Sequence, residues 1–279
     1  MGSDFPADYR GLLKSALISG SIFFSFLKTK KTDLCTGTYI LQQTNTTYPD
    51  NCNTMLIRPK LLIFDVNGTL LDFKPIKVAL ANTLANELAF DSWFAELLHY
   101  STSESITGRY RDFGEIATAT LRMTAERFDK QISETKIRDI VALIKKLPPH
   151  QDVHRALSHI RDKGIPMVTL TNGSTATLKA QLAYAELDHF FENIFSVESV
   201  RLYKPHPATY HHVIKEMKIS PIYSMLVSTH AWDLMGAQRA GLMTGFVQRP
   251  NRQGYPLMDP PTLSVGSLTA LSELLTGKS

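Results

Sequence analysis

Four short polar segments in this chain of 279 residues lie at or near the ends of apolar runs, and their residue types could form a nucleophile site. The segments are Asp65-Val-Asn67-Gly68-Thr69, Thr171-Asn172-Gly173-Ser174, Lys204-Pro-His-Pro207 and Ser228-Thr-His230-Ala-Trp-Asp233. A carboxylate is a weak nucleophile in water, but it becomes reactive in a dry crevice where a nearby positive charge keeps it ionised. Asp65 is therefore the candidate nucleophile, and Lys204 is the cation that would keep its pKa low.

The other residues of these segments have types that would support such a carboxylate. Thr69 could orient Asp65 through a hydrogen bond, and Gly68 lets the backbone turn sharply over the carboxylate. Asp233 could pair with Lys204 and position a water molecule for a hydrolytic step. Together these groups predict a two-step reaction in which water removes a covalent intermediate from Asp65.

The elements that would bring these segments together are predicted by the hydrophobic pattern. Five nearly continuous apolar runs are typical of strands buried on both faces, at 61–64, 165–170, 194–197, 225–227 and 244–247. Helical stretches separate them at 151–163, 174–186, 207–217 and 233–240. This alternation predicts an α/β fold, a doubly wound parallel sheet with right-handed crossovers, whose ligands bind beyond the carboxyl ends of the strands.

One interval, between the first two strands, departs from this alternation. It holds stretches with helical spacing at 75–89, 92–100, 113–127 and 133–146, and Pro148-Pro149 closes it. We therefore expect residues 73–148 to form an inserted helical cap, and residues 55–72 and 149–279 to form the core. Residues 1–54 differ in composition from the rest, and we expect a poorly ordered leader there, with a targeting segment as the alternative.

The same four segments resemble the motifs of the haloacid dehalogenase superfamily over about residues 59–276. Motif one corresponds to Asp65-Val-Asn-Gly-Thr-Leu-Leu-Asp72, motif two to Thr171-Asn-Gly-Ser174, motif three to Lys204-Pro-His-Pro-Ala-Thr-Tyr210, and motif four to His230-Ala-Trp-Asp233-Leu-Met-Gly-Ala237. The form of motif four resembles the type II 2-haloacid dehalogenases. The resemblance implies a Rossmann-like core with a helical cap.

The resemblance also implies a reaction and a role for each matching residue. In that family the aspartate displaces halide from the carbon next to a carboxylate, with inversion, and water hydrolyses the resulting ester. Carried over by motif, Asp65 is the nucleophile and is supported by Thr69, Lys204, Ser228 and Asp233. Thr171 and Asn172 would bind the substrate carboxylate or the halide, and Tyr210 would pair with the charged network.

Two substitutions separate dehalogenase from phosphatase chemistry within this superfamily. Its magnesium-dependent phosphatases carry a second aspartate as a general acid where this chain has Asn67, and an aspartate where it has Ser228. A halide leaves as a stable anion and needs no proton, whereas loss of general acid help costs a phosphatase about 10²–10⁴-fold in rate. With Lys204 supplying the positive charge, we expect no metal and no cofactor; magnesium belongs to the phosphatase alternative.

Two further positions depart from the haloacid enzymes. Those enzymes place an arginine after a tryptophan in the cap, where it meets the halide and the carboxylate, but the equivalent pair here is Trp93-Phe94. Arg109 or Arg111 could replace it, or both could be surface residues. The best-known members also have asparagine at the position of His230. We expect Asn67, Phe94 and His230 to face the substrate.

Composition and charge limit the remaining alternatives. The net charge is +4, but the basic residues are scattered without interleaved aromatics, so nucleic acid is an unlikely partner. Cys35 and Cys52 both precede the core, so neither a disulfide framework nor a cysteine metal site holds it together. We expect a cytoplasmic protein whose core has no membrane contact and which acts on a small molecule, a short 2-halo carboxylate, with a homodimer as the candidate assembly. The alternatives are a phosphate ester hydrolase and a catalytically idle binding protein.

Overall fold

A parallel sheet of six strands, in the order β3-β2-β1-β4-β5-β6, forms the centre of the computed structural model, which describes residues 58–277. Every neighbouring pair is parallel. The strands are β1 (Leu61–Phe64), β2 (Met167–Thr171), β3 (Asn193–Ser196), β4 (Ser224–Ser228), β5 (Met243–Val247) and β6 (Leu263–Val265). The first five confirm the strands predicted from apolar runs, with shifts of one or two residues at their ends.

The sequence did not predict β6 or the helix that follows it. β6 has only three residues at the edge of the sheet, and its burial alternates between buried and exposed. So short a segment carries no recognisable period. Helix α10 (Leu268–Thr276) begins after Ser267, whose side chain accepts a hydrogen bond from the Ala270 amide and caps the helix.

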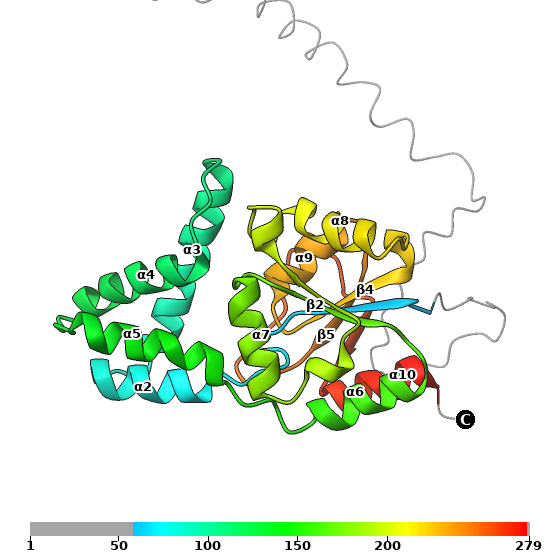
Figure 1. The fold of residues 1–279 in the computed structure, drawn as a ribbon, viewed down its shortest axis with the longest axis horizontal. Coiled ribbons are helices and arrows are strands. Elements are labelled where there is room, and N and C mark those ends of the chain that lie inside the picture. Colours follow the sequence, from blue (N-terminus) through cyan, green and yellow to red (C-terminus); the bar gives the residue numbers. More distant parts are fainter. Residues whose placement is uncertain (1–57, 278–279) are drawn as a thin grey trace, which may run out of the picture. The chain divides into compact units, whose positions relative to one another are not determined.

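Helices cover both faces of the sheet (Figure 1). Helices α6 (Val153–Asp162) and α10 pack against each other on one face, while α8 (Pro207–Glu216) and α9 (Ala231–Arg239) lie on the opposite face. Helix α7 (Thr175–Tyr184) contacts β3, and short 3-10 helices occupy Asp188–Phe190 (η3), Val197–Ser199 (η4) and Pro221–Tyr223 (η5). Gly164 and Gly241, which the sequence placed at helix ends, have φ angles of 70° and 83°.

Most of the segment between β1 and β2 is helical, as predicted, but the helix predicted at 75–89 ends at Leu84 and the next one already begins at Ala89. The segment contains α2 (Lys74–Leu84), α3 (Ala89–Ile106), α4 (Phe113–Arg127), α5 (Glu134–Ala142) and the 3-10 helix η2 (Leu143–Lys146), which pack in sequence beside the sheet (Figure 1). Helix α3 extends past the predicted end at residue 100 to Ile106, and the hydroxyls of Ser101, Ser103 and Ser105 donate hydrogen bonds within it to carbonyls four residues earlier. The division into core and cap stays a prediction.

None of the helices within residues 58–277 combines the length and apolar character needed to cross a bilayer. The predicted leader, residues 1–54 with Cys35 and Cys52, lies outside the described residues, as do residues 55–57 of the predicted core.

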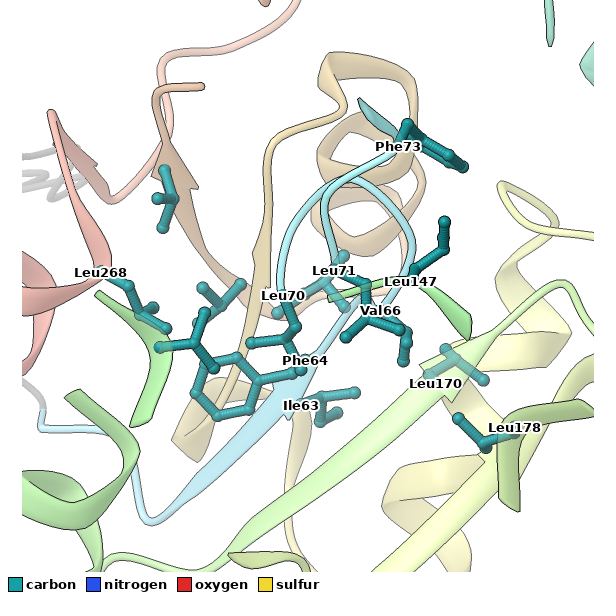
Figure 2. Packing of buried hydrophobic residues seen from close by; sticks show 14 of the residues in the cluster. Ile63, Phe64, Val66, Leu70, Leu71, Phe73, Leu147, Leu170, Leu178 and Leu268 are labelled. Carbon is teal, nitrogen blue, oxygen red and sulfur yellow. The ribbon is translucent and has the colours of Figure 1, made fainter. Parts of the chain in front are cut away.

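The core is densest around β1, whose residues 61–64 are fully buried. Figure 2 shows Ile63 and Phe64 among Val66, Leu70, Leu147, Leu170 and Leu268, which come from segments far apart in the chain. A strand buried on both faces favours apolar residues on both sides, which accounts for the unbroken apolar sequence of β1. The strand therefore ends where the first polar residue, Asp65, can find partners.

The position of β1 gives a direct test of this packing. We expect Ile63→Ala to lower the free energy of unfolding by about 2–5 kcal/mol, because it leaves a cavity that the sheet cannot close. Ile63→Val should cost about 0.5–1.5 kcal/mol. Urea denaturation of the three proteins measures both values, and equal stability of all three would contradict the packing described here.

Candidate active site

Asp65 sits at the carboxyl end of β1, at the start of a tight turn. Its amide donates to the carbonyl of Val227 on the neighbouring strand, at 3.0 Å. Gly68 turns the chain with a φ of 86°, and a Cβ there would lie 2.9 Å from the Phe73 ring and 3.2 Å from His230 Nε2. Only glycine satisfies both the backbone angle and this close contact. The turn thereby brings Thr69 back beside Asp65.

Lys204 lies between two buried carboxylates. Its Nζ donates to Asp65 Oδ1 and to Asp233 Oδ2, each at 2.8 Å, and to the carbonyl of Leu170 at 3.0 Å. The ammonium group has three protons, so all of its donors are used. The Lys204 side chain is 1% exposed, and those of Asp65 and Asp233 are 7% and 0% exposed, so bulk water hardly screens the three charges.

The charges of this trio determine which of its members are ionised. Burial acts to raise the pKa of Asp65, but the Lys204 ammonium, with smaller contributions from His230 and the Thr69 hydroxyl, outweighs it, and the pKa lies below its usual value of 3.8. Burial likewise acts to lower the pKa of Lys204, yet Asp233 and then Asp65 raise it. Burial raises the pKa of Asp233, with the nearby Asp65 charge acting in the same direction. Asp65 is therefore the more readily ionised carboxylate of the pair.

Hydroxyl groups complete the contacts of both carboxylates. Thr69 Oγ1 donates to Asp65 Oδ2 at 2.7 Å and accepts from the Thr229 amide at 3.0 Å. Tyr210 OH donates to Asp233 Oδ1 at 2.6 Å. Ser228 Oγ accepts from the His230 amide at 3.1 Å, so it orders the turn after β4. The buried carboxylates thus have defined orientations.

A small cavity lies beside Asp65. Polar groups line its floor: Asp65, Asn67, Thr171, Asn172, Lys204 and His230. Its other walls are apolar and include Phe73, Trp93, Phe94, Leu97, Leu98, Phe113, Ile144 and Trp232. A small pocket with apolar walls and a few converging polar groups is typical of a site for a small molecule.

The amides predicted to meet the substrate are held in place by the fold. Asn172 Oδ1 accepts from the backbone amide of Lys204 at 3.0 Å. Asn67 Oδ1 accepts at 2.7 Å from Gln181, whose amide also donates to the Ile144 carbonyl at 2.8 Å. The sequence analysis missed Gln181, a fully buried polar residue on α7. Its only signal was a polar position among apolar neighbours.

His230 lies beside the nucleophile and forms part of the cavity wall. Its Nε2 is 2.9 Å from the Asn67 carbonyl and 3.6 Å from Asp65 Oδ2, and its ring stacks on Trp232. Burial lowers the pKa of His230 below 6.5, so the ring is neutral at pH 7. A carbonyl only accepts, so the hydrogen-bond pattern assigns the ring proton to Nε2. At neutral pH, Lys204 is therefore the cation that keeps Asp65 ionised.

Two residues outside the predicted set hold the turn that carries Asp65. Arg249 donates to the Thr69 carbonyl at 2.9 and 3.2 Å and forms an ion pair with Asp152 at 2.9 Å. His150 Nε2 lies 3.1 Å from the Gly68 carbonyl. Arg249 follows β5 by two residues. The expectation that ligands bind beyond the carboxyl ends of the strands, applied to the fifth predicted strand, would have pointed to it.

The two arginines considered as replacements for the missing cap arginine do not line the cavity. Arg109 and Arg111 are both exposed, and Arg111 pairs with Glu104 at 3.0 Å. Their surface interpretation is the one that agrees with the structure. Trp93 both packs and lines the cavity, and its Nε1 donates to the Ala117 carbonyl at 3.0 Å.

A family model described as haloacid dehalogenase-like hydrolase matches residues 59–241, about two thirds of the sequence. The chain belongs to this family. The buried aspartate at the end of β1 and the lysine facing it lie within the matched residues, and the family assignment confirms the resemblance found in the four motifs.

Among individual proteins, (S)-2-haloacid dehalogenase H-109 of Pseudomonas putida is 28% identical over 216 residues, covering 77% of this chain and 96% of that protein. Haloacetate dehalogenase H-2 of Moraxella sp. (strain B) is 27% identical over 216 residues, with coverage of 77% and 96%. The structure of L-2-haloacid dehalogenase from Xanthobacter autotrophicus with chloropropionic acid covalently bound has a TM-score of 0.73 at 24% identity, covering 79% of this chain and all of that chain. This structural likeness supports the fold.

In this haloacid dehalogenase-like hydrolase the predicted residues fall into three groups. Direct hydrogen bonds connect one group, which consists of Asp65, Thr69, Lys204, Asp233 and Tyr210. A second group lines the cavity: Asn67, Phe94, Thr171, Asn172 and His230. Ser228 lies behind the site and orders its loop. The catalytic and binding roles of these residues stay predictions.

The shared lysine generates the first prediction for this site. We expect Lys204→Met to destabilise the protein by about 3–5 kcal/mol, because two buried carboxylates lose the ammonium group that pairs with both of them. Adding Asp233→Asn should recover part of that loss, since it removes one of the two like charges. Lys215→Met, on an exposed position of α8, serves as the control and should change little. A neutral effect of Lys204→Met in denaturant unfolding would contradict the ion-pair geometry.

His230 generates a prediction about pH. Its folded-state pKa lies below 6.5, so in this range the unfolded chain binds a proton that the folded protein excludes. Stability must then fall as pH decreases below 6.5, until the folded pKa is reached. We expect His230→Asn to show a flatter decline there than the unsubstituted protein, measured by urea unfolding at successive pH values. Parallel curves would show that His230 titrates normally.

Proposed function

We propose that this protein hydrolyses the carbon–halogen bond of short 2-halo carboxylates, with the (S) enantiomer as substrate. The observation that carries the proposal is the buried Asp65 carboxylate, kept ionised by Lys204 at the floor of a small apolar cavity. The names of the P. putida and Moraxella relatives, which specify a 2-haloacid and a haloacetate, support this substrate class.

In the first step, a carboxylate oxygen of Asp65 would attack the carbon that carries the halogen. The new carbon–oxygen bond forms as the carbon–halogen bond breaks, and the halide leaves with the bonding electron pair. Attack from the side opposite the halogen inverts that carbon. Apolar walls favour this step because they remove the water that would otherwise solvate the attacking carboxylate.

In the second step, water would attack the carboxyl carbon of the Asp65 ester. The bond between that carbon and the substrate oxygen breaks, so the 2-hydroxy acid leaves with its inverted centre unchanged. Asp233, held by Lys204 and Tyr210, is the carboxylate suited to accept the proton of the attacking water. The whole reaction consumes one water molecule and releases one halide and one proton.

The surroundings of Asp65 support halide as the leaving group better than an alkoxide from a phosphate ester. Asn67 stands two residues after the nucleophile, and an amide supplies no proton to an alkoxide. Lys204 Nζ also lies 2.8 Å from both carboxylates, where it supplies the positive charge that a divalent cation would otherwise bring. We therefore propose a reaction that needs no magnesium, and we keep the expected homodimer and cytoplasmic location as parts of the same proposal.

The first experiment compares substrates. The purified protein is incubated with (S)-2-chloropropionate and, separately, with an aryl phosphate, each with a chelator or with added Mg²⁺. We expect halide release that the chelator leaves unchanged, and no phosphate release. Asp65→Asn should lower halide release by roughly 10⁴-fold or more, as expected for loss of a nucleophile, whereas Asp139→Asn, an exposed position on α5, should leave it unchanged. Phosphate release dependent on Mg²⁺ would support the phosphatase alternative instead.

A second measurement tests the covalent intermediate directly. With enzyme in excess over substrate in heavy-oxygen water, the first turnover should place the heavy oxygen in Asp65 and leave the product unlabelled. Direct attack of water on the substrate would put the label in the product, which would refute the ester mechanism. Absence of turnover over a broad panel of halocarboxylates would favour a binding protein.

A further inference from the structure

The proposed substrate carries a carboxylate, which a cation would bind more strongly than the neutral side chains of Thr171 and Asn172 can. Lys204 is already bound by Asp65, Asp233 and the Leu170 carbonyl, so it has no free proton for a third anion. The lining described for the cavity includes no arginine, and Phe94 stands where the resemblance expects one. The cation that would receive the carboxylate therefore has to come from another part of the chain.

Arg252, in the loop between β5 and β6, lies at the edge of this site. Its guanidinium carbon is 5.6 Å from the centre of the Phe94 ring, and Phe94 is part of the cavity wall. The loop is tied to the nucleophile turn, because the Arg252 amide donates to the Arg249 carbonyl at 3.0 Å and Arg249 in turn donates to the Thr69 carbonyl. The position of Arg252 is thus coupled to that of the turn that carries Asp65.

The electrostatic surroundings of Arg252 are those of a cation close to the active site. Burial lowers its pKa, while the carboxylates of Asp91 and Asp65 act to raise it. Its charge also helps to lower the pKa of His230. Within residues 58–277, no hydrogen bond or ion pair engages its guanidinium group. A partly buried guanidinium with unused donors is suited to bind a carboxylate in a bidentate manner.

We propose that Arg252 binds the substrate carboxylate at the cavity mouth, so that a loop of the core supplies the cation that haloacid dehalogenases place in the cap. Phe94 is then a positioning residue, whose ring face attracts the guanidinium where an arginine at the same place would repel it. The two differences, Phe94 in the cap and Arg252 in the loop, compensate each other. This inference rests on the proposed function, and it names the specificity-determining residue of the same site.

The kinetic test compares variants at position 252. Arg252→Met keeps an apolar stem against Phe94 but removes the charge, and we expect KM for (S)-2-chloropropionate to rise about 10- to 100-fold, the range for losing a charge-assisted hydrogen bond. The KM of Arg252→Lys should lie between those of the unsubstituted protein and Arg252→Met, because lysine retains the charge without the planar fork of the guanidinium. Turnover of the uncharged 2-chloropropionamide should not respond to either variant. Arg155→Met, which removes one exposed positive charge on α6, is the matched control.

A charge exchange tests the compensation between the two positions. The double variant Phe94→Arg with Arg252→Met moves the cation to the cap position. Its KM should return most of the way from the raised value of Arg252→Met to that of the unsubstituted protein. An unchanged KM in Arg252→Met would overturn the inference while leaving the proposed dehalogenase activity intact. If Arg252→Met raised KM equally for 2-chloropropionamide, the inference would be overturned as well, because the effect would then be structural.

A binding experiment separates this inference from the proposed function. Propionate carries the carboxylate but no leaving group, so it reports binding without chemistry. We expect propionate to raise the thermal unfolding temperature of the unsubstituted protein and of Arg155→Met, but not of Arg252→Met. That pattern would support carboxylate binding by Arg252 even if no halocarboxylate were turned over. Equal shifts in all three proteins, or no shift in any, would refute it.

Discussion

The ammonium group of Lys204, placed between the carboxylates of Asp65 and Asp233, is the interaction on which the rest of this site depends. Three buried charges are costly to assemble, and they are tolerated here because each has a charged or hydroxyl partner within hydrogen-bond distance. Hydrophobic residues in the same space would stabilise the fold at least as well. Stability alone therefore does not account for the trio, which agrees with the catalytic role proposed for it, and Asp65 is the member that its surroundings keep ionised at the cavity.

The surrounding structure fixes the orientation of this trio and shields it from water. Arg249 and His150 form hydrogen bonds with backbone carbonyls of the turn after Asp65. Gly68 lets the same turn bring Thr69 back to the carboxylate. Helices inserted between β1 and β2 contribute aromatic and aliphatic walls above the same carboxylate. The charged and hydroxyl groups of the site thus come from the strand ends and the loops after them, while the inserted helices supply most of its apolar lining, the environment that the proposed reaction requires.

How well the sequence predicted the structure depends on how far apart in the chain the interacting residues lie. The five apolar runs became strands, and the four polar segments after them met at one edge of the sheet, because parallel strands end on the same side. The failures have physical causes. β6 is too short to show a period, and the polar, serine-rich residues 101–105 hid the continuation of α3. Of the two interpretations given for Arg109 and Arg111, surface positions agree with the structure. Gln181, Arg249 and Arg252 were missed because their roles depend on partners far away in the chain.

The sequence by itself predicted the candidate nucleophile, its lysine, five of the six strands and the family, because these depend on residue types at short spacings and on local periodicity. Only the tertiary structure decided that all three protons of Lys204 are used, that the ring of His230 is buried and neutral, and that Arg252 lies over the Phe94 ring. Such facts depend on which distant side chains share a few ångströms of space and on how much water reaches them, and neither is encoded in any single stretch of residues.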